Sequence, residues 1–190
     1  MVTQKSRVYT KTHLLVEAAI MVALSTALSL VKIWELPLGG SVTLLSMLPI
    51  CMLSLRHGLK WGLGGAFVYA VGQLALGLSE VLSWGLTPTA LVGTFFLDYI
   101  FAFTVLGLAG MFRERGFTGK MIGVALVIFL RFVCHFISGV IIFDVWMPEE
   151  WSNVYLYSIC YNGTFMLPEM IFTMIAAPGV VTAIEKIKTR

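Results

Sequence analysis

The sequence carries very little charge for its length. Charged residues make up 12% of its 190 residues, hydrophobic residues make up 58%, and the mean hydropathy is +0.91. Soluble domains usually carry about 25% charged residues. A water-soluble fold of this composition would expose large apolar patches, so lipid is the better solvent. The formal net charge of +3 is also too small to indicate a nucleic-acid partner.

The sequence also lacks the patterns of disulfide frameworks, metal centres and common catalytic sites. Its three cysteines are scattered and form no C-x-x-C pair, which excludes a disulfide framework. No second His or Cys stands at metal-ligand spacing from His135. No H-E-x-x-H, G-x-S-x-G or Walker A sequence occurs. We therefore predict no catalytic residue, no metal site and no cofactor.

Long apolar runs dominate the chain. They are continuous rather than alternating, which favours helices over a transmembrane barrel. A spanning helix needs about 20 mostly apolar residues. We predict one all-α integral membrane domain over residues 1–190, a bundle of six transmembrane helices at about 14–31, 38–55, 61–78, 90–112, 121–143 and 155–181. The second span is the weakest, because Gly39, Gly40 and Pro49 interrupt it, and a tilted short helix or a partly re-entrant segment is the alternative there.

Basic residues gather on one side of this six-span arrangement. That side holds both termini and the links between spans two and three and between spans four and five. The positive-inside rule places it in the cytoplasm. The prediction is therefore a multi-pass protein of the bacterial plasma membrane with both termini cytoplasmic. Eleven of the thirteen Lys and Arg residues lie on that side: Lys5, Arg7, Lys11, Arg56, Lys60, Arg113, Arg115, Lys120, Lys186, Lys188 and Arg190.

A few ionisable residues lie inside the predicted spans, where they are costly and usually functional. Arg131 and His135 are four residues apart in span five and share one helix face. Asp98 lies in the outer half of span four, and Glu169 lies near the middle of span six, on the same face as Asn162. Three helices thus direct polar groups inward, which indicates a polar cavity. A structural Asp98–Arg131 pair is the alternative.

Small residues recur along the first predicted span. Ala19, Ala23 and Ala27 are spaced four apart and form a flat stripe on one helix face. The stripe either packs within the bundle or docks another membrane subunit.

Several segments resemble the substrate-binding S component of energy-coupling-factor (ECF) vitamin transporters, most closely the thiamine-specific member. The alanine stripe resembles the family's A-x-x-x-A signature, and residues 54–62 resemble its second cytoplasmic-side turn. Residues 98–103, 131–139 and 157–163 are similar to parts of its fourth, fifth and sixth helices. The last three segments occur in the family's order and at matching depths, which makes the resemblance fairly specific.

The resemblance implies a vitamin held near the outer face by helices four to six and capped by the first outer loop. In that reading Asp98 offsets the thiazolium charge of thiamine or bonds its aminopyrimidine, and Trp34 closes over the site. The implied binding residues are Trp34, Asp98, Tyr99, His135, Tyr157 and Asn162. Thiamine is a cation with two aromatic rings, so aromatic side chains and a carboxylate both suit it.

The resemblance also implies partners. The alanine stripe would dock on the ECF transmembrane coupling subunit, which works with two cytoplasmic ATPase subunits. The chain departs from the family at Phe143, where a tryptophan is usual, and in the outer loop 79–87, which carries Glu80 and Trp84. Three alternatives therefore stay open. They are an S component for riboflavin or a thiamine precursor, an intramembrane enzyme using Asp98, His135 and Glu169, and a proton-coupled carrier, although no inverted repeat is evident.

Overall fold

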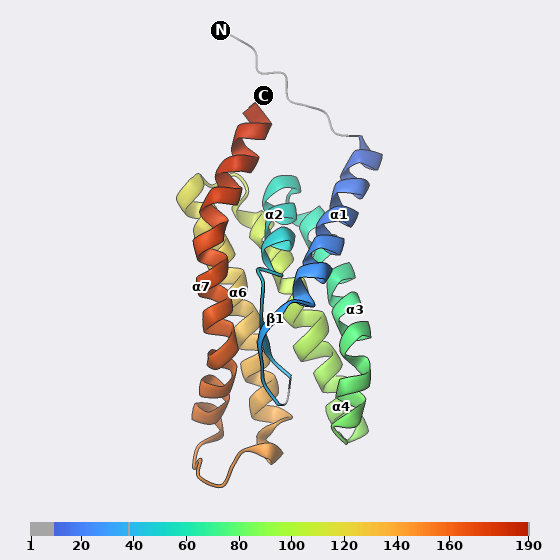
Figure 1. Cartoon of the computed structure of the whole chain (residues 1–190), viewed down its shortest axis with the longest axis vertical. Helices are drawn as coiled ribbons and strands as arrows, with labels where there is room; N and C mark the ends of the chain where they lie inside the picture. The colour runs from blue at the N-terminus through green and yellow to red at the C-terminus, as the bar shows by residue number, and fades with distance from the viewer. Residues whose placement is uncertain (1–9, 38, 190) are drawn as a thin grey trace.

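A computed structural model describes residues 10–37 and 39–189, with side chains up to residue 186. Within these residues the regular secondary structure is helical except for one short antiparallel hairpin, and short loops join the elements (Figure 1). The elements in order are α1 (Lys11–Ser29), β1 (Lys32–Glu35), β2 (Ser41–Thr43), α2 (Leu48–His57), α3 (Leu59–Ser83), α4 (Pro88–Thr94), the π-helix η1 (Phe95–Phe101), α5 (Ala102–Thr104), the 3-10 helix η2 (Val105–Phe112), α6 (Phe117–Ile141), the 3-10 helix η3 (Asp144–Trp146) and α7 (Val154–Thr189).

Five helical segments of the described chain are long and apolar enough to cross a membrane. They are α1, α3, the continuous run from α4 to η2, α6 and α7. They run along the long axis of the molecule. The first residues of α1 and the last residues of α7 lie at the same end of it (Figure 1). Their outer surfaces expose many large apolar side chains, which suit lipid rather than water. The structure is therefore that of a multi-pass membrane protein.

Polar caps explain where several of these helices begin. Thr10, Thr87 and Asn153 each accept a hydrogen bond from a backbone N–H three residues further on, at 3.1–3.3 Å. Such side chains satisfy donors that a first helical turn leaves unpaired. Pro88 then fits the first position of α4, where it needs no N–H.

The second predicted span differs from the prediction. Its first half, from residue 39, belongs to the β1–β2 hairpin, whose turn contains Gly39 and Gly40 at φ +74° and +80°. Only Leu48–His57 is helical, and 10 residues extend about 15 Å, half of the roughly 30 Å hydrocarbon core. Pro49 starts this helix instead of interrupting it, because a first turn tolerates a missing N–H. The six-helix bundle is thus five long helices plus one half-length helix.

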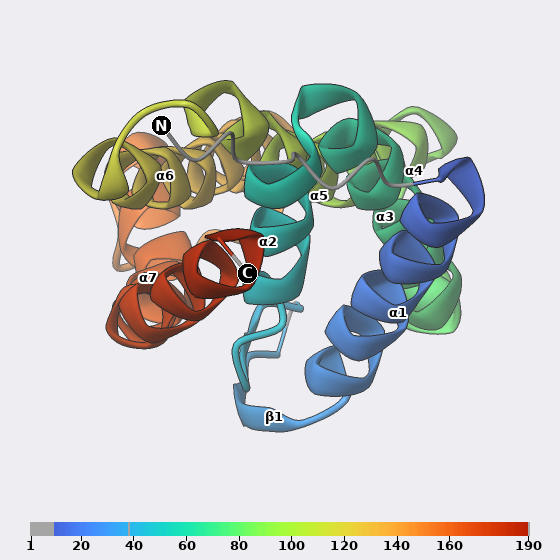
Figure 2. The same cartoon turned by 90° about the horizontal axis from the view of Figure 1, so that it is seen from above.

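The short helix α2 lies at the centre of the molecule. It contacts α1, α3, η2 and α7, and its residues from Leu48 to Leu55 are all buried (Figure 2). The hairpin lies between α1 and α7 and extends from the start of α2 toward the opposite end of the bundle (Figure 1 and Figure 2). Gly58, at φ +86°, reverses the chain between α2 and α3, a conformation that favours glycine. The half-length helix therefore fills one end of the bundle and leaves the other end to the hairpin.

Helices α3 and η2 cross at a contact that only glycines permit. A Cβ on Gly107 would lie 2.7 Å from the backbone of Gly62. Beside them, the hydroxyl of Ser54 on α2 donates to the Gly107 carbonyl and accepts from the Gly110 N–H at 2.7 Å. Small residues allow helix backbones this close in membranes. The three elements are therefore joined at one point.

Seven of the basic residues used in the positive-inside argument have described side chains, and they lie near one end of the bundle, whereas Lys32 and Arg131 line the cavity at the hairpin. The seven lie close to helix ends, and several are paired with acids: Arg56 with Glu17 at 2.8 Å, Arg113 with Glu114 at 3.2 Å, and Lys120 with Glu185. Lys5, Arg7, Lys188 and Arg190, which the positive-inside argument also used, lie outside the described side chains. The three cysteines are free.

Candidate functional site

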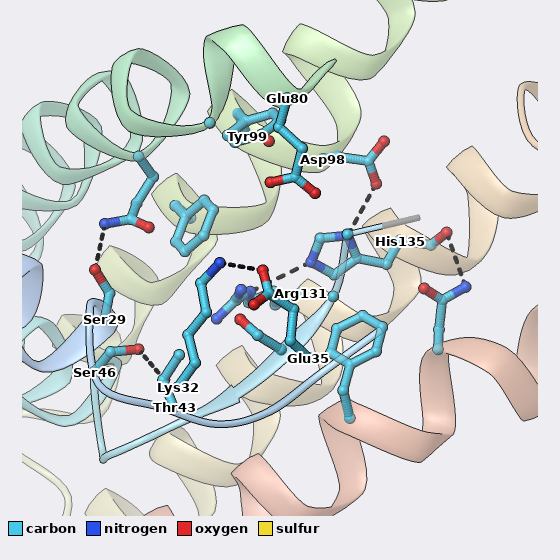
Figure 3. A pocket seen from close by; sticks show the side chains of 18 of the residues that line it. Ser29, Lys32, Glu35, Thr43, Ser46, Glu80, Asp98, Tyr99, Arg131 and His135 are labelled. Atoms are coloured by element: carbon cyan, nitrogen blue, oxygen red, sulfur yellow. Dashed lines mark hydrogen bonds and ion pairs between the residues drawn. The ribbon is translucent and has the colours of Figure 1, made fainter. Parts of the chain in front are cut away.

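A cavity of about 280 Å³ lies at the hairpin, beside the last turn of α1 and the first turns of α7. Figure 3 shows it from close by. Its walls come from the hairpin and from α3, η1, α6 and α7. Five of the six predicted binding residues line it, namely Asp98, Tyr99, His135, Tyr157 and Asn162. Cavities near 300 Å³ with aromatic walls and a few polar groups are typical of small-molecule sites.

Asp98 and His135 form the polar centre of the cavity. Asp98 Oδ1 lies 2.9 Å from His135 Nδ1, and Asp98 Oδ2 accepts a hydrogen bond from the Ser138 hydroxyl. Asp98 lies on the π-helix η1. π-Helical turns are rare in proteins overall, and those that occur are often found at functional sites. Both oxygens of this carboxylate are therefore bonded to α6, which fixes η1 against it. The alternative Asp98–Arg131 pair is not the contact that forms.

Arg131 determines which nitrogen of His135 carries the proton. Its Nε lies 3.4 Å from His135 Nε2, and a guanidinium can only donate. Nε2 is therefore the acceptor, and Nδ1–H donates to Asp98. The guanidinium also lies 4.1 Å from the centre of the Phe103 ring, and the Arg131 residue is only 9% exposed. One arginine thus holds the imidazole in a single tautomer.

The α7 wall supplies an amide and two tyrosines. Asn162 Nδ2 donates to the Ser158 carbonyl at 2.9 Å and to the His135 carbonyl at 3.3 Å, which leaves its Oδ1 as a free acceptor among the described residues. The Tyr161 hydroxyl donates to the Gly39 carbonyl at 3.2 Å. Tyr157 packs between Tyr161 and the ring of Trp151. This wall combines hydrogen-bonding capacity with flat aromatic surface.

The hairpin covers the cavity, but Trp34 does not face it. The β1–β2 register is irregular between Lys32 and Trp34, so Lys32 and Glu35 both line the cavity and pair with each other. Trp34 is 55% exposed and lies outside the lining. The bulge breaks the two-residue alternation of a strand. The predicted loop is therefore at the site, although the predicted tryptophan is not in its wall.

Glu169 holds the base of the hairpin instead of lining the cavity. Its Oε1 accepts hydrogen bonds from the Thr43 N–H and the Thr43 hydroxyl, both at 2.5 Å, and the side chain is buried. Thr43 also bonds Ser46 at 2.7 Å. The structure thus separates Glu169 from Asp98 and His135, and the acid–base trio of the enzyme alternative is not assembled.

One face of α3 was not predicted to take part in the site. Gln73, Gly77, Glu80 and Trp84 line the cavity at positions separated by four, three and four residues. That spacing is the helical signal that identifies the face. Trp84 packs edge-on against Phe143 at 5.8 Å, where the resembling family usually has a tryptophan. An indole therefore does lie at this wall, but it comes from α3.

A bundle of apolar helices around a partly open polar and aromatic cavity defines a multi-pass membrane protein with a small-molecule site. The family model described as "Thiamine transporter protein" matches residues 15–189. The chain therefore belongs to the thiamine transporter protein family, which is a family of transporters rather than enzymes.

Matches to individual proteins support the same family membership. The chain is 34% identical over 175 residues to the thiamine transporter ThiT of Bacillus subtilis (strain 168), which covers 85% of this chain and 86% of that protein. It is 29% identical over 152 residues to ThiT of Lacticaseibacillus paracasei, covering 72% and 71% of the two chains. A solved structure of ThiT from Listeria monocytogenes has a similar fold, with a TM-score of 0.71 and 18% identity over 94% of this chain and 98% of that one. The thiamine-specific resemblance of the sequence is thereby confirmed.

Proposed function

We propose that this protein binds thiamine in the described cavity and is the substrate-binding S component of an ECF importer. The observation that carries the proposal is the Asp98–His135 pair, which joins η1 to α6 within an aromatic cavity. The hydrogen-bonded carboxylate of Asp98, the neutral imidazole of His135 and the amide of Asn162 suit a ligand that has both a charge and a heteroaromatic ring. The membership of the thiamine transporter protein family supports thiamine as that ligand.

Each lining residue then has a role that follows from its free atoms. Asp98 uses one lone pair per oxygen on the protein, so it can still accept from the aminopyrimidine. The free Oδ1 of Asn162 is a second acceptor for the same ring. Tyr99, Tyr157 and His135 supply ring faces and edges for stacking. In this proposal Trp34 closes the entrance from outside the wall.

Thiamine titration of the purified, detergent-solubilised protein tests this function. We expect saturable quenching of tryptophan fluorescence at submicromolar thiamine, because Trp84 is in the cavity wall. Trp84→Phe is expected to remove most of that signal, whereas Trp61→Phe, at the start of α3, is expected to keep it. Saturable binding of riboflavin but not thiamine would transfer the site to the alternative vitamin. The absence of any response would contradict the proposal.

Transport would require the ECF transmembrane coupling subunit and two cytoplasmic ATPase subunits. Helix α1 supports a docking role, because only 11% of its spanning window is buried, against 22–28% in the other four helices. Ala19, Ala23 and Ala27 are all exposed, so the stripe is not used for packing within the described chain. We also propose that the first residues of α1 and the last residues of α7 lie in the cytoplasm of the bacterial cell, because most basic residues gather at that end of the bundle.

A bulkier side chain on the alanine stripe is expected to separate transport from binding. Ala23→Leu should reduce thiamine uptake by cells that express the ECF module by about fivefold or more, because it separates close-packed helices. Thiamine affinity of the purified variant should stay unchanged, since α1 position 23 is outside the cavity. Ala75→Leu, at an exposed position of α3, is the matched control and should transport normally. Normal uptake by Ala23→Leu would contradict docking through this stripe.

A further inference from the structure

Among the residues that the structure describes, Glu80 is the charged group of the cavity without a partner. Its side chain extends from α3 into the cavity, near Tyr99 and Asp98 (Figure 3). Beyond the backbone hydrogen bonds of α3, its backbone carbonyl accepts a hydrogen bond from the Ser83 hydroxyl at 2.6 Å. Within residues 10–37 and 39–189, no hydrogen bond or ion pair reaches the Glu80 carboxylate. The group is therefore available to a ligand.

The neighbouring charges are already engaged by the protein. Lys32 pairs with Glu35 within the hairpin, so its positive charge is already engaged and does not compensate Glu80. Asp98 has one protein donor on each oxygen, from His135 and Ser138. Arg131 donates to His135 and lies over Phe103. Glu80 is thus the one acidic lining residue in the described chain with neither oxygen bonded.

The net charge of the cavity lining agrees with an unpaired Glu80. Three acidic residues and two basic residues line the cavity, which leaves an excess of one negative charge when His135 is neutral. A carboxylate that loses water to a ligand needs a compensating charge, because an unpaired buried charge is strongly unfavourable. The cavity therefore favours a cationic ligand over a neutral one of the same shape.

We propose that Glu80 is the counter-ion of the ligand's cationic ring and gives the site its preference for a positive charge. The inference rests on the proposed function, in which the ligand is thiamine and the ring is its thiazolium. Trp84 lies four residues further along the same face of α3, so one helix presents a carboxylate and an indole side by side. Both groups attract a cationic aromatic ring. Asp98, in contrast, orients His135 and accepts from the uncharged ring.

The test compares thiamine with its neutral isostere, in which carbon replaces the thiazolium nitrogen. Calorimetric titration of Glu80→Gln should show thiamine affinity reduced about fivefold, with the affinity of the neutral isostere unchanged. Glu80→Asp, which keeps the charge, should retain most of the preference for thiamine. Glu149→Gln makes the same change of charge at an exposed residue outside the cavity and should alter neither affinity.

Two results would overturn the role of Glu80. One is a Glu80→Gln protein that binds thiamine as tightly as the unaltered protein. The other is an equal loss of affinity for both ligands, which would show a change of cavity shape rather than a lost charge. If the unaltered protein bound no thiamine, the proposed function itself would be contradicted, and with it this role. Thermal unfolding of each variant without ligand shows whether it is folded, so that affinities are compared only between folded proteins.

Discussion

Replacing Asp98 by asparagine is expected to weaken thiamine binding about tenfold or more, which corresponds to at least about 1.4 kcal/mol. The substitution keeps the size of the side chain but removes its charge. One carboxylate oxygen becomes an NH2 group, which faces the Ser138 hydroxyl and cannot accept its hydrogen bond. Hydrogen bonds to charged groups are worth about 1.5–3 kcal/mol, so their loss and the loosening of His135 account for the effect.

Asp144→Asn is the matched control for this variant. Asp144 lies in the exposed 3-10 helix η3, outside the cavity lining, and its replacement should leave the affinity unchanged. Calorimetric titration of both purified variants gives the comparison. Because Asp98 serves the position of His135 and the uncharged ring, thiamine and its neutral isostere should weaken by similar factors. A folded Asp98→Asn protein with unaltered affinity would contradict the role of Asp98 in the site.

Placing a valine at Gly62 is expected to prevent assembly of the bundle. Even the first carbon of a side chain there would lie 2.0 Å from Ser54 Oγ and 2.8 Å from the Gly107 carbonyl oxygen. The obstructing oxygen of Gly107 belongs to the backbone and cannot rotate away. Overpacking of a core costs about 1–3 kcal/mol, and backbone collision at a helix crossing exceeds the usual case. We expect little monodisperse protein after detergent extraction, as measured by size-exclusion chromatography.

Gly64→Val provides a control two residues further along the same helix. Nothing lies within 4 Å of the position that its Cβ would occupy, and the residue is exposed. The same valine should therefore be extracted in normal yield and keep its affinity for thiamine. Equal recovery of both variants would show that α3 and η2 do not require the close approach at Gly62 and Gly107.

The membrane bundle was predictable because long apolar runs have few other uses. Helices occupy five of the six predicted stretches in the described chain, and their polar caps agree with residues such as Thr87 and Asn153. The second stretch was misread because hydropathy does not distinguish a buried hairpin followed by a short helix from a spanning helix. Both bury apolar residues, and only the glycine pair at 39 and 40 indicated a turn.

The site was predictable where ionisable groups lie deep in a span. Asp98 and His135 were recognised for that reason, and they meet at 2.9 Å. Glu80 and Trp84 were not recognised, because the predicted third span ended at residue 78 and left both in an outer loop. The helix α3 continues to Ser83, since a cavity rather than lipid receives its polar face. Hydropathy marks where lipid contact ends, which is earlier than where the helix ends.

The half-length of α2 has a consequence for the stability of the bundle. Where a full helix would continue, the bundle holds the β1–β2 hairpin and the cavity of about 280 Å³. Side chains that would have packed on the missing turns face that cavity instead. A molecule bound in the cavity contacts these side chains and so supplies packing that the missing helical turns do not. Any compound that fits the cavity therefore stabilises the folded state, and the gain rises with the logarithm of its concentration over its dissociation constant.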